Sequence, residues 1–372
     1  MKTILTILGT RPEAVKLAPV LRELDRRKKV FRSMVCVTGQ HRELLDPMLE
    51  FFGIRSDFDL HVMKKNQRLA GLTARLLTAL DPVLADVKPD WVVVQGDTTT
   101  VMAAALAAYY RGIRVAHVEA GLRTDNKYSP FPEEINRRLA GVLADAHFAP
   151  TARAVRHLRR EGVSPERICL SGNTVVDALN WAVGLVRKNS PVWPSDIPVL
   201  KKGRRLILVT GHRRENFGEG MEQMCLALRD IADELSDCEL VYPVHLNPNV
   251  REPVNRLLGG HPRIHLAAPV EYPVMVELLK NAWLVLTDSG GIQEEAPTFG
   301  VPCLVMRGTT ERPEGIAQGV AKLVGTDRKK IVDAVKRLNR DAKAYARMAR
   351  GGNPYGDGQA SKRIADWLET RK

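Results

Sequence analysis

Short apolar segments rich in valine and isoleucine recur along the first half of the chain. They are Ile4–Leu8, Met34–Val37, Trp91–Val94 and Val115–Val118. Each is followed by glycine or polar residues and then by a longer segment with helical periodicity. Strands that alternate with helices in this way predict a parallel sheet with helices on both faces.

The same pattern begins again in the second half of the chain. Predicted strands lie at Leu206–Val209, Leu240–Val244, Ile264–Leu266, Leu284–Leu286 and Leu304–Met306. Two sets of alternating elements predict an α/β fold with two doubly wound, Rossmann-like parallel-sheet domains and a cleft between them.

The segment NSPVWPSDIPVLKKGRR, residues 189–205, separates the two sets of strands. It is rich in proline and charge and has no periodicity, so we predict a loop or linker there. We predict a first domain of residues 1–171 and a second domain of residues 172–357. A final helix at about Gly358–Glu369, within residues 358–372, is expected to cross back to the first domain.

The composition fits two soluble globular domains. The chain has 372 residues, 44% of them hydrophobic and 27% charged, and 372 residues exceed what one core usually holds. No apolar run approaches the length of about 20 residues that spans a bilayer, and the N-terminal apolar segment is too short for a signal peptide. The five cysteines are far apart and form no CxxC pair, so we expect reduced core thiols, no zinc site and a cytoplasmic location.

The net charge of +13 indicates acidic partners, such as phosphorylated metabolites, nucleic acid or a membrane surface. The basic runs are short and scattered, and such runs usually face water. Aromatic residues make up only 5% and do not interleave with the basic ones. Stacking platforms for single-stranded nucleic acid are therefore not indicated, and we expect no nucleic-acid partner.

Polar residues at the carboxyl ends of parallel strands are the candidates for chemistry, because ligands bind at that edge. In TDSGGIQEEAP, Gly290 and Gly291 would let a diphosphate approach a helix N-terminus, and Ser289 could add a hydroxyl donor. Glu294 or Glu295 could accept hydrogen bonds from a ribose diol, but neighbouring helical residues point about 100° apart, so only one would reach it. The alternative is a tight turn followed by acids that suit the helix dipole.

The motif GTRPEAVKLAP follows the first predicted strand. Pro12 would open a helix capped by Thr10. Arg11 and Lys16 are placed where they could meet a phosphate, and the alternative is ordinary surface charge. No GxGxxG fingerprint is present, so an NAD site is not indicated and we expect no cofactor.

Four ionisable residues stand after predicted strands or at a helix start. Asp97 lies in QGDTTT, where the alternative role is a helix N-cap. Glu119 lies in HVEAGLRT and suits a general acid or base. Glu133, in SPFPEEINRR, could instead be a first-turn helix acid. His212 opens a loop in VTGHRRENFGEG, and no two histidines have metal-ligand spacing on one helix face, so no metal site is predicted. Ionisable groups beside a turn that binds a diphosphate are suited to transferring a proton at carbon while a diphosphate leaves.

The motifs together resemble those of the non-hydrolysing UDP-N-acetylglucosamine 2-epimerases of bacterial type. The resemblance covers essentially the whole chain and rests on many motifs in order, listed here: GTRPEAVKLAP, VTGQHRELLD, GDTTT, HVEAGLRT, SPFPEEINRR, GNTVVDAL, VTGHRRENFGEG, YPVHLNPNVREPV, TDSGGIQEEAP, TTERPEG and NPYGDGQAS. It implies the two-domain GT-B architecture, with the nucleotide mostly on the second domain. It also implies interconversion of UDP-N-acetylglucosamine and UDP-N-acetylmannosamine through elimination of UDP to 2-acetamidoglucal and re-addition.

The resemblance implies roles for individual residues. The implied catalytic residues are Asp97, Glu119, Glu133 and His212, with the choice of base and acid left open. The implied UDP contacts are Arg11, Arg213, His245, Ser289, Gly290, Gly291 and Glu295. An allosteric substrate site is implied at Gln40, Arg68 and Glu134. Family members are usually dimers, so a homodimer is expected.

Two positions depart from the family pattern. Gly308 in RGTTERPE stands where the family pattern has Asp, and Gln95 stands where some relatives have His. Neither belongs to the implied catalytic set, and both are expected to be peripheral. The alternatives that stay open are the hydrolysing epimerase, which releases free N-acetylmannosamine, and a GT-B glycosyltransferase.

Overall fold

The computed structural model describes residues 1–40, 42–64, 67–198 and 203–371. Residues 199–202 of the predicted linker lie outside the described residues. The chain forms two compact units. Unit 1 comprises Met1–Trp181 and Gly356–Lys372, and unit 2 comprises Ala182–Tyr355. The division falls inside helix α7 (Thr174–Lys188).

Unit 1 contains a seven-stranded sheet in the order β3-β2-β1-β4-β5-β6-β7, and every pairing is parallel. The strands are β1 (Lys2–Leu8), β2 (Phe31–Val37), β3 (Phe58–Asp59), β4 (Trp91–Gln95), β5 (Arg114–Val118), β6 (Ala146–Ala149) and β7 (Ile168–Leu170). The strand order reverses between β1 and β4, as in doubly wound folds, so the carboxyl ends of β1, β4 and β5 share one edge.

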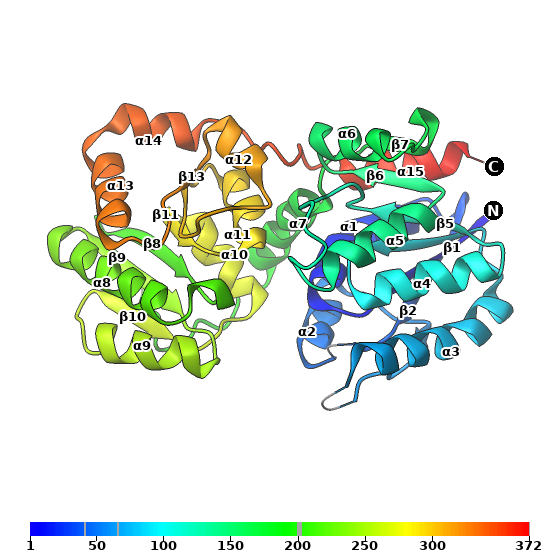
Figure 1. Cartoon of the computed structure of the whole chain (residues 1–372), viewed down its shortest axis with the longest axis horizontal. Helices are drawn as coiled ribbons and strands as arrows, with labels where there is room; N and C mark the ends of the chain where they lie inside the picture. The colour runs from blue at the N-terminus through cyan, green and yellow to red at the C-terminus, as the bar shows by residue number, and fades with distance from the viewer. Residues whose placement is uncertain (41, 65–66, 199–202, 372) are drawn as a thin grey trace. The chain divides into compact units, whose positions relative to one another are not determined.

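Helices connect these strands and cover the sheet (Figure 1). They are α1 (Arg11–Arg26), α2 (Arg42–Phe52), α3 (Leu69–Val87), α4 (Thr99–Tyr110), α5 (Glu133–Leu143), α6 (Ala152–Arg160), a 3-10 turn at Pro165–Arg167, and α15 (Ala360–Thr370). Helix α15 returns to unit 1 from the far end of the chain. The Asp177 carboxylate accepts hydrogen bonds from the Ala360 and Ser361 backbone N–H groups, and Lys2 Nζ donates to the Leu368 carbonyl at 2.8 Å.

Unit 2 contains a six-stranded parallel sheet in the order β10-β9-β8-β11-β12-β13. Its strands are β8 (Arg205–Thr210), β9 (Cys238–Pro243), β10 (Ile264–Ala267), β11 (Ala282–Thr287), β12 (Cys303–Val305) and β13 (Ala321–Leu323). Its helices are α8 (Glu219–Glu234), α9 (Pro248–Leu258), α10 (Tyr272–Asn281), α11 (Gly290–Glu295), α12 (Pro313–Gln318), α13 (Arg328–Arg340) and α14 (Ala342–Ala349), with 3-10 turns at Arg214–Asn216 and Ala296–Phe299.

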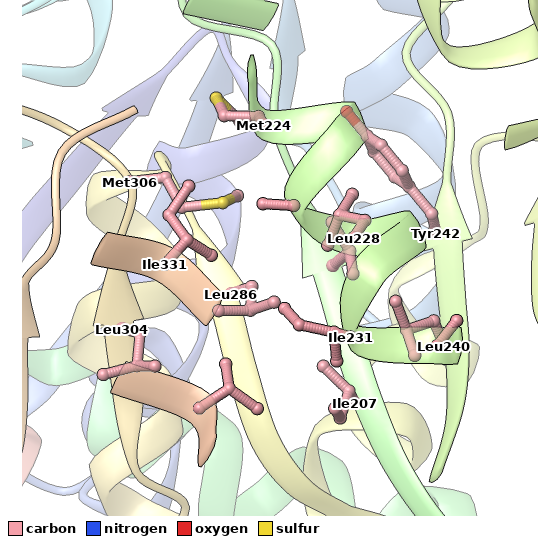
Figure 2. Packing of buried hydrophobic residues seen from close by; sticks show 14 of the residues in the cluster. Ile207, Met224, Leu228, Ile231, Leu240, Tyr242, Leu286, Leu304, Met306 and Ile331 are labelled. Carbon is pink, nitrogen blue, oxygen red and sulfur yellow. The ribbon is translucent and has the colours of Figure 1, made fainter. Parts of the chain in front are cut away.

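The core of unit 2 shows why its strands read as continuous apolar runs. In Figure 2, Ile207 and Leu286 from adjacent strands lie near Ile231 of α8, and Leu304 from the next strand lies on the side of Ile331 of α13. When helices cover both faces of a sheet, the side chains on both sides of each strand are buried, so the strands contain few polar residues.

The two doubly wound parallel sheets confirm the predicted fold class, and all nine predicted strands are present. The sequence reading missed β3, β6, β7 and β13. Three of them have only two or three residues, and β3, β7 and β13 lie at sheet edges, where an apolar run is least needed. No described helix is long and apolar enough to cross a membrane.

Two buried histidines lie opposite each other in the sheet of unit 1. His117 on β5 pairs in register with His147 on β6. Burial lowers the pKa of His117 to about 4 and that of His147 to about 3. Both rings are therefore neutral in the folded protein, whereas the unfolded chain takes up protons near pH 6.5.

We expect the free energy of unfolding to fall as the pH drops from 6.5 toward 4, because the unfolded state then binds more protons. Each histidine contributes a loss of about 2 kcal/mol between pH 6.5 and 5. The variant His147→Leu should lose about 2 kcal/mol less than the unchanged chain over this interval, measured by urea unfolding at both pH values. The exposed His61→Gln is the matched control. Equal losses in His147→Leu and the unchanged chain would contradict the assignment.

Candidate active site

Glu119 stands directly after β5 and is the most heavily bonded carboxylate of unit 1's sheet edge. Only 8% of the residue is exposed. Lys16 Nζ of α1 contacts both carboxylate oxygens, at 2.7 and 2.8 Å. The Gln95 amide donates to Oε2, and Asn173 Nδ2 donates to Oε1 at 3.4 Å. Side chains from three separate segments of the chain therefore hold this carboxylate in place.

The backbone at Glu119 is unusual. Its φ is +64°, a left-handed conformation that non-glycine residues seldom adopt. Gly121, two residues on, has φ +88°, and a Cβ there would lie 2.5 Å from the Ala154 carbonyl oxygen. The glycine lets the turn pass close to α6. Strain of this kind is typically found where function fixes a side chain.

Asp97 follows β4, the neighbour of β5. Its carboxylate accepts a hydrogen bond from Arg137 Nη2 at 2.5 Å, and its carbonyl accepts from Asn136 Nδ2 at 3.0 Å. The N-cap of α4 is Thr98, whose hydroxyl accepts from the Val101 N–H. The alternative role of Asp97 as the helix cap is therefore excluded.

The turn after β1 is tied to the turn after β4 by Glu13. This fully buried carboxylate accepts from the Gly9 N–H at 2.6 Å, the Thr10 N–H at 2.8 Å and the Thr98 hydroxyl at 2.5 Å. Burial raises the pKa of Glu13 to about 7. Thr10 is the N-cap of α1 and Pro12 lies in its first turn, as the sequence predicted. Arg11 is half-buried at the start of that helix.

Glu133 and Glu134 open α5 and differ sharply in environment. Glu133 is half-buried. Glu134 is fully buried, and its carboxylate accepts from the Thr124 N–H, from Arg137 at 3.3 Å and from Arg138 at 3.0 Å. Arg137 therefore joins the carboxylate of Asp97 to that of Glu134.

The two other residues of the predicted allosteric site also lie in unit 1. Gln40 is buried, and its side-chain oxygen accepts from the Thr100 hydroxyl at 2.8 Å. Arg68 is exposed at the N-cap of α3. An allosteric role for these residues and Glu134 stays a prediction.

We expect Arg137→Gln to lower kcat by roughly 10- to 100-fold, because Asp97, a predicted catalytic residue, loses the bond that orients it, and a displaced catalytic group slows the chemical step. Glu134 also loses a partner, so the melting temperature should fall. Arg138→Gln is the matched control, since Arg138 contacts Glu134 but not Asp97. Arg137→Lys should retain part of the activity. Equal kcat values for Arg137→Gln and Arg138→Gln would contradict a positioning role for Arg137.

In unit 2, Asp288 organises the loop after β8. This buried carboxylate accepts from the N–H groups of His212 and Arg213, at 2.9 and 2.8 Å, and from Asn216 Nδ2 at 3.1 Å. The His212 ring stacks on His245, with centroids 5.3 Å apart. Burial lowers the pKa of His212, although Asp288 opposes the shift. The ring is therefore neutral near pH 7 in the unliganded protein.

The TDSGG turn follows β11 at the neighbouring strand end. Ser289 is the N-cap of α11, and its N–H donates to the Thr287 hydroxyl at 2.9 Å. Gly290 is buried and Gly291 is exposed. A Cβ built on Gly290 would lie 3.8 Å from Arg213 Nη2, so the guanidinium lies beside the turn. A bare backbone and a cation thus meet at the start of α11.

The adjacent acids Glu294 and Glu295 have separate surroundings. Glu294 is buried, and its carboxylate accepts a hydrogen bond from Arg312 Nε. Glu295 is half-buried. Glu294 is thus held in the protein interior by a charged partner, and Glu295 is the more exposed of the two acids.

Among the described residues, no group of three or more His, Cys, Asp or Glu side chains is arranged to hold a metal ion.

Comparison with known proteins shows which family has these features. The model of a family described as UDP-N-acetylglucosamine 2-epimerase matches residues 22–369. The chain belongs to this family. It is 52% identical over 372 residues to the UDP-N-acetylglucosamine 2-epimerase of Escherichia coli (strain K12), covering 99% of each chain. The Salmonella typhimurium enzyme of the same name is 52% identical over 370 residues, covering 99% of this chain and 98% of that one.

A solved structure matches the whole fold. It is the UDP-GlcNAc 2-epimerase from Neisseria meningitidis bound to UDP-GlcNAc, with a TM-score of 0.92 and 45% identity. The match covers 99% of this chain and 100% of that chain. The relation to the epimerase family therefore spans both units.

Within this epimerase fold, the structure corrects one expectation. Gln95 is not peripheral, because its amide donates to the Glu119 carboxylate. Gly308 is exposed in open space, where a side chain would meet nothing within 4 Å. Lys16, predicted to meet a phosphate, has its ammonium on Glu119, and its contact with UDP stays a prediction.

The sequence reading missed four residues that hold the candidate groups in this member of the epimerase family. Asn173 and Gln95 bind Glu119, Arg137 binds Asp97, and Asp288 fixes the loop of His212. Asn173, Arg137 and Asp288 stand inside motifs that carry the resemblance, GNTVVDAL, SPFPEEINRR and TDSGG, and Gln95 directly precedes another, GDTTT. A polar residue in or beside such a motif that has no assigned catalytic or binding role is a candidate for a supporting contact of this kind, and this signal could have identified the four residues.

Proposed function

We propose that the protein interconverts UDP-N-acetylglucosamine and UDP-N-acetylmannosamine without net hydrolysis. The observation that carries this proposal is a pair of carboxylates, Asp97 and Glu119, at the ends of adjacent strands, each bonded to a cation of its own. Membership of the epimerase family and the bound UDP-GlcNAc in the Neisseria meningitidis relative support the choice of substrate.

The reaction proceeds by elimination and re-addition. A carboxylate base takes the proton from C2, the C2–H electron pair forms the C1=C2 double bond, and the C1–O bond breaks with its electrons leaving on UDP. The products are 2-acetamidoglucal and UDP, both retained. A proton is then delivered to the opposite face of C2, and a UDP oxygen forms the new bond to C1.

The proposed division of labour follows the partners of each group. Residues of unit 2 bind UDP: Arg213 and the Ser289–Gly291 turn meet the diphosphate, Glu295 the ribose, and His212 donates to the departing phosphate oxygen. Arg11 and His245 are further UDP contacts. Carboxylates of unit 1 handle the C2 proton.

The proposed roles of the three carboxylates follow from their contacts. The ionised form of a carboxylate is the form that accepts a proton, and Asp97 and Glu119 form ion pairs with Arg137 and Lys16. Glu133 is half-buried in the first turn of α5. We propose Asp97 and Glu119 as proton acceptors from C2 and Glu133 as the group that returns a proton.

The product tests this proposal. Purified protein is incubated with UDP-N-acetylglucosamine and followed by proton and phosphorus NMR. UDP-N-acetylmannosamine with the diphosphate still attached to C1 is the expected product. Free UDP together with N-acetylmannosamine in equal amounts would establish the hydrolysing enzyme instead, and an unchanged substrate would contradict both.

A further inference from the structure

Helix α6 of unit 1 carries four exposed arginines within nine residues: Arg153, Arg156, Arg159 and Arg160. Its buried side consists of Ala154 and Leu158, one turn apart. At about 100° per residue, the four arginines fall within an arc of about 120° opposite these two. The helix therefore has one apolar face against the sheet and a face toward solvent that carries the four arginines and no acid.

None of the four arginines has an acidic partner in the part of the chain that the structure describes. The nearest acid in sequence, Glu161, is bonded to Arg123 at 2.6 and 2.7 Å, so its charge is already matched. By contrast, Arg328 of α13 makes a bidentate contact with Asp230 at 2.6 Å. The α6 face is thus an unusual concentration of unpaired positive charge.

An exposed apolar side chain lies on the strand that packs beside α6. Ile168 of the edge strand β7 packs with Ala154 and Leu158 of α6. Leu170, two residues on, points to the same side of the sheet, because strand side chains alternate. Its side chain is exposed, with 54% of its surface accessible. Figure 1 shows α6 and β7 side by side at this edge of unit 1.

We propose that α6 and Leu170 form a peripheral membrane-binding surface that recognises the phosphates of anionic phospholipids. Guanidinium groups bind phosphate oxygens through paired N–H donors. A helix face with many like charges suits a plane of mobile headgroups, and the exposed leucine can enter the boundary between headgroups and acyl chains. The α6 segment contains no aromatic residue on which a nucleic-acid base could stack, which disfavours that partner.

The full-length protein is sedimented with vesicles of phosphatidylglycerol and phosphatidylcholine, and in parallel with phosphatidylcholine alone. We expect binding only to the anionic vesicles, weakening as salt is added. The triple variant Arg153→Gln, Arg156→Gln, Arg160→Gln should bind roughly a hundredfold more weakly, because each cation near an anionic surface contributes about a fivefold gain.

The matched control removes the same charge elsewhere, with Lys29→Gln, Lys329→Gln and Lys343→Gln, three exposed residues off α6. It should bind like the unchanged chain. Three outcomes would overturn the proposal: no binding to anionic vesicles, equal loss in the control and the α6 variant, or retention by duplex DNA but not by vesicles. Epimerase turnover serves as the folding check, since none of these residues belongs to the candidate site.

Discussion

Glu119→Gln is expected to reduce kcat by at least about a thousandfold while changing KM little. The amide keeps the shape of the side chain but cannot take the C2 proton, and proton transfer by a positioned group contributes about 10²- to 10⁴-fold. Glu119 is not among the residues to which UDP binding is assigned, so affinity for the nucleotide should be preserved. Initial rates over a range of substrate concentrations separate the two parameters.

Stability must be separated from chemistry in this variant, because Lys16 loses the carboxylate it contacts at 2.7 Å. Only 12% of the Lys16 side chain is exposed, so removing its counter-charge should lower the free energy of unfolding. The double variant Lys16→Met, Glu119→Gln removes both charges and should recover much of the lost stability while staying inactive. Recovery of activity in the double variant, or near-normal kcat in Glu119→Gln, would show that Glu119 has a structural role only.

His212→Asn is expected to lower kcat by roughly 100- to 1000-fold. A donor aimed at developing charge has an effect of this size when it is removed. The ring is neutral in the unliganded protein because burial lowers its pKa, and an arriving diphosphate favours its protonated form. The loss should therefore appear in kcat more than in KM.

His261→Asn is the matched control for this change. His261 lies in the same unit and contacts Asp233 at 3.0 Å, away from the loop of Asp288. It should leave kcat within about twofold, a change of well under 1 kcal/mol in barrier height. A His212→Asn enzyme as active as the His261→Asn enzyme would remove His212 from the mechanism.

The long central strands could be read from the sequence because burial on both faces demands continuous apolar runs, as in WVVV after Pro89 and Asp90. The edge strand β7, with the sequence ICL, is too short to show a continuous apolar run. Helix α1 could also be read, since its cap and proline are local signals. Features that depend on local signals, such as apolar runs and helix caps, could therefore be predicted from the sequence.

The candidate groups could be named from motifs, but their partners could not. Asn173 lies 54 positions from Glu119, and Arg137 lies 40 positions from Asp97. Tertiary packing decides such pairs, and no local spacing encodes them. Lys16 illustrates the difference: its place after β1 suggests a phosphate contact, whereas the structure directs its ammonium to Glu119.

Exchange at C2 tests the central claim most directly. The protein is incubated with UDP-N-acetylglucosamine in deuterated water, and C2 of both nucleotide sugars is examined by proton NMR. The account predicts UDP-N-acetylmannosamine that carries deuterium at C2, because the abstracted proton is replaced from solvent-exchanged groups before UDP re-adds. Conversion with the original hydrogen retained at C2, or binding of the substrate without any exchange, would contradict a mechanism based on carboxylate proton transfer.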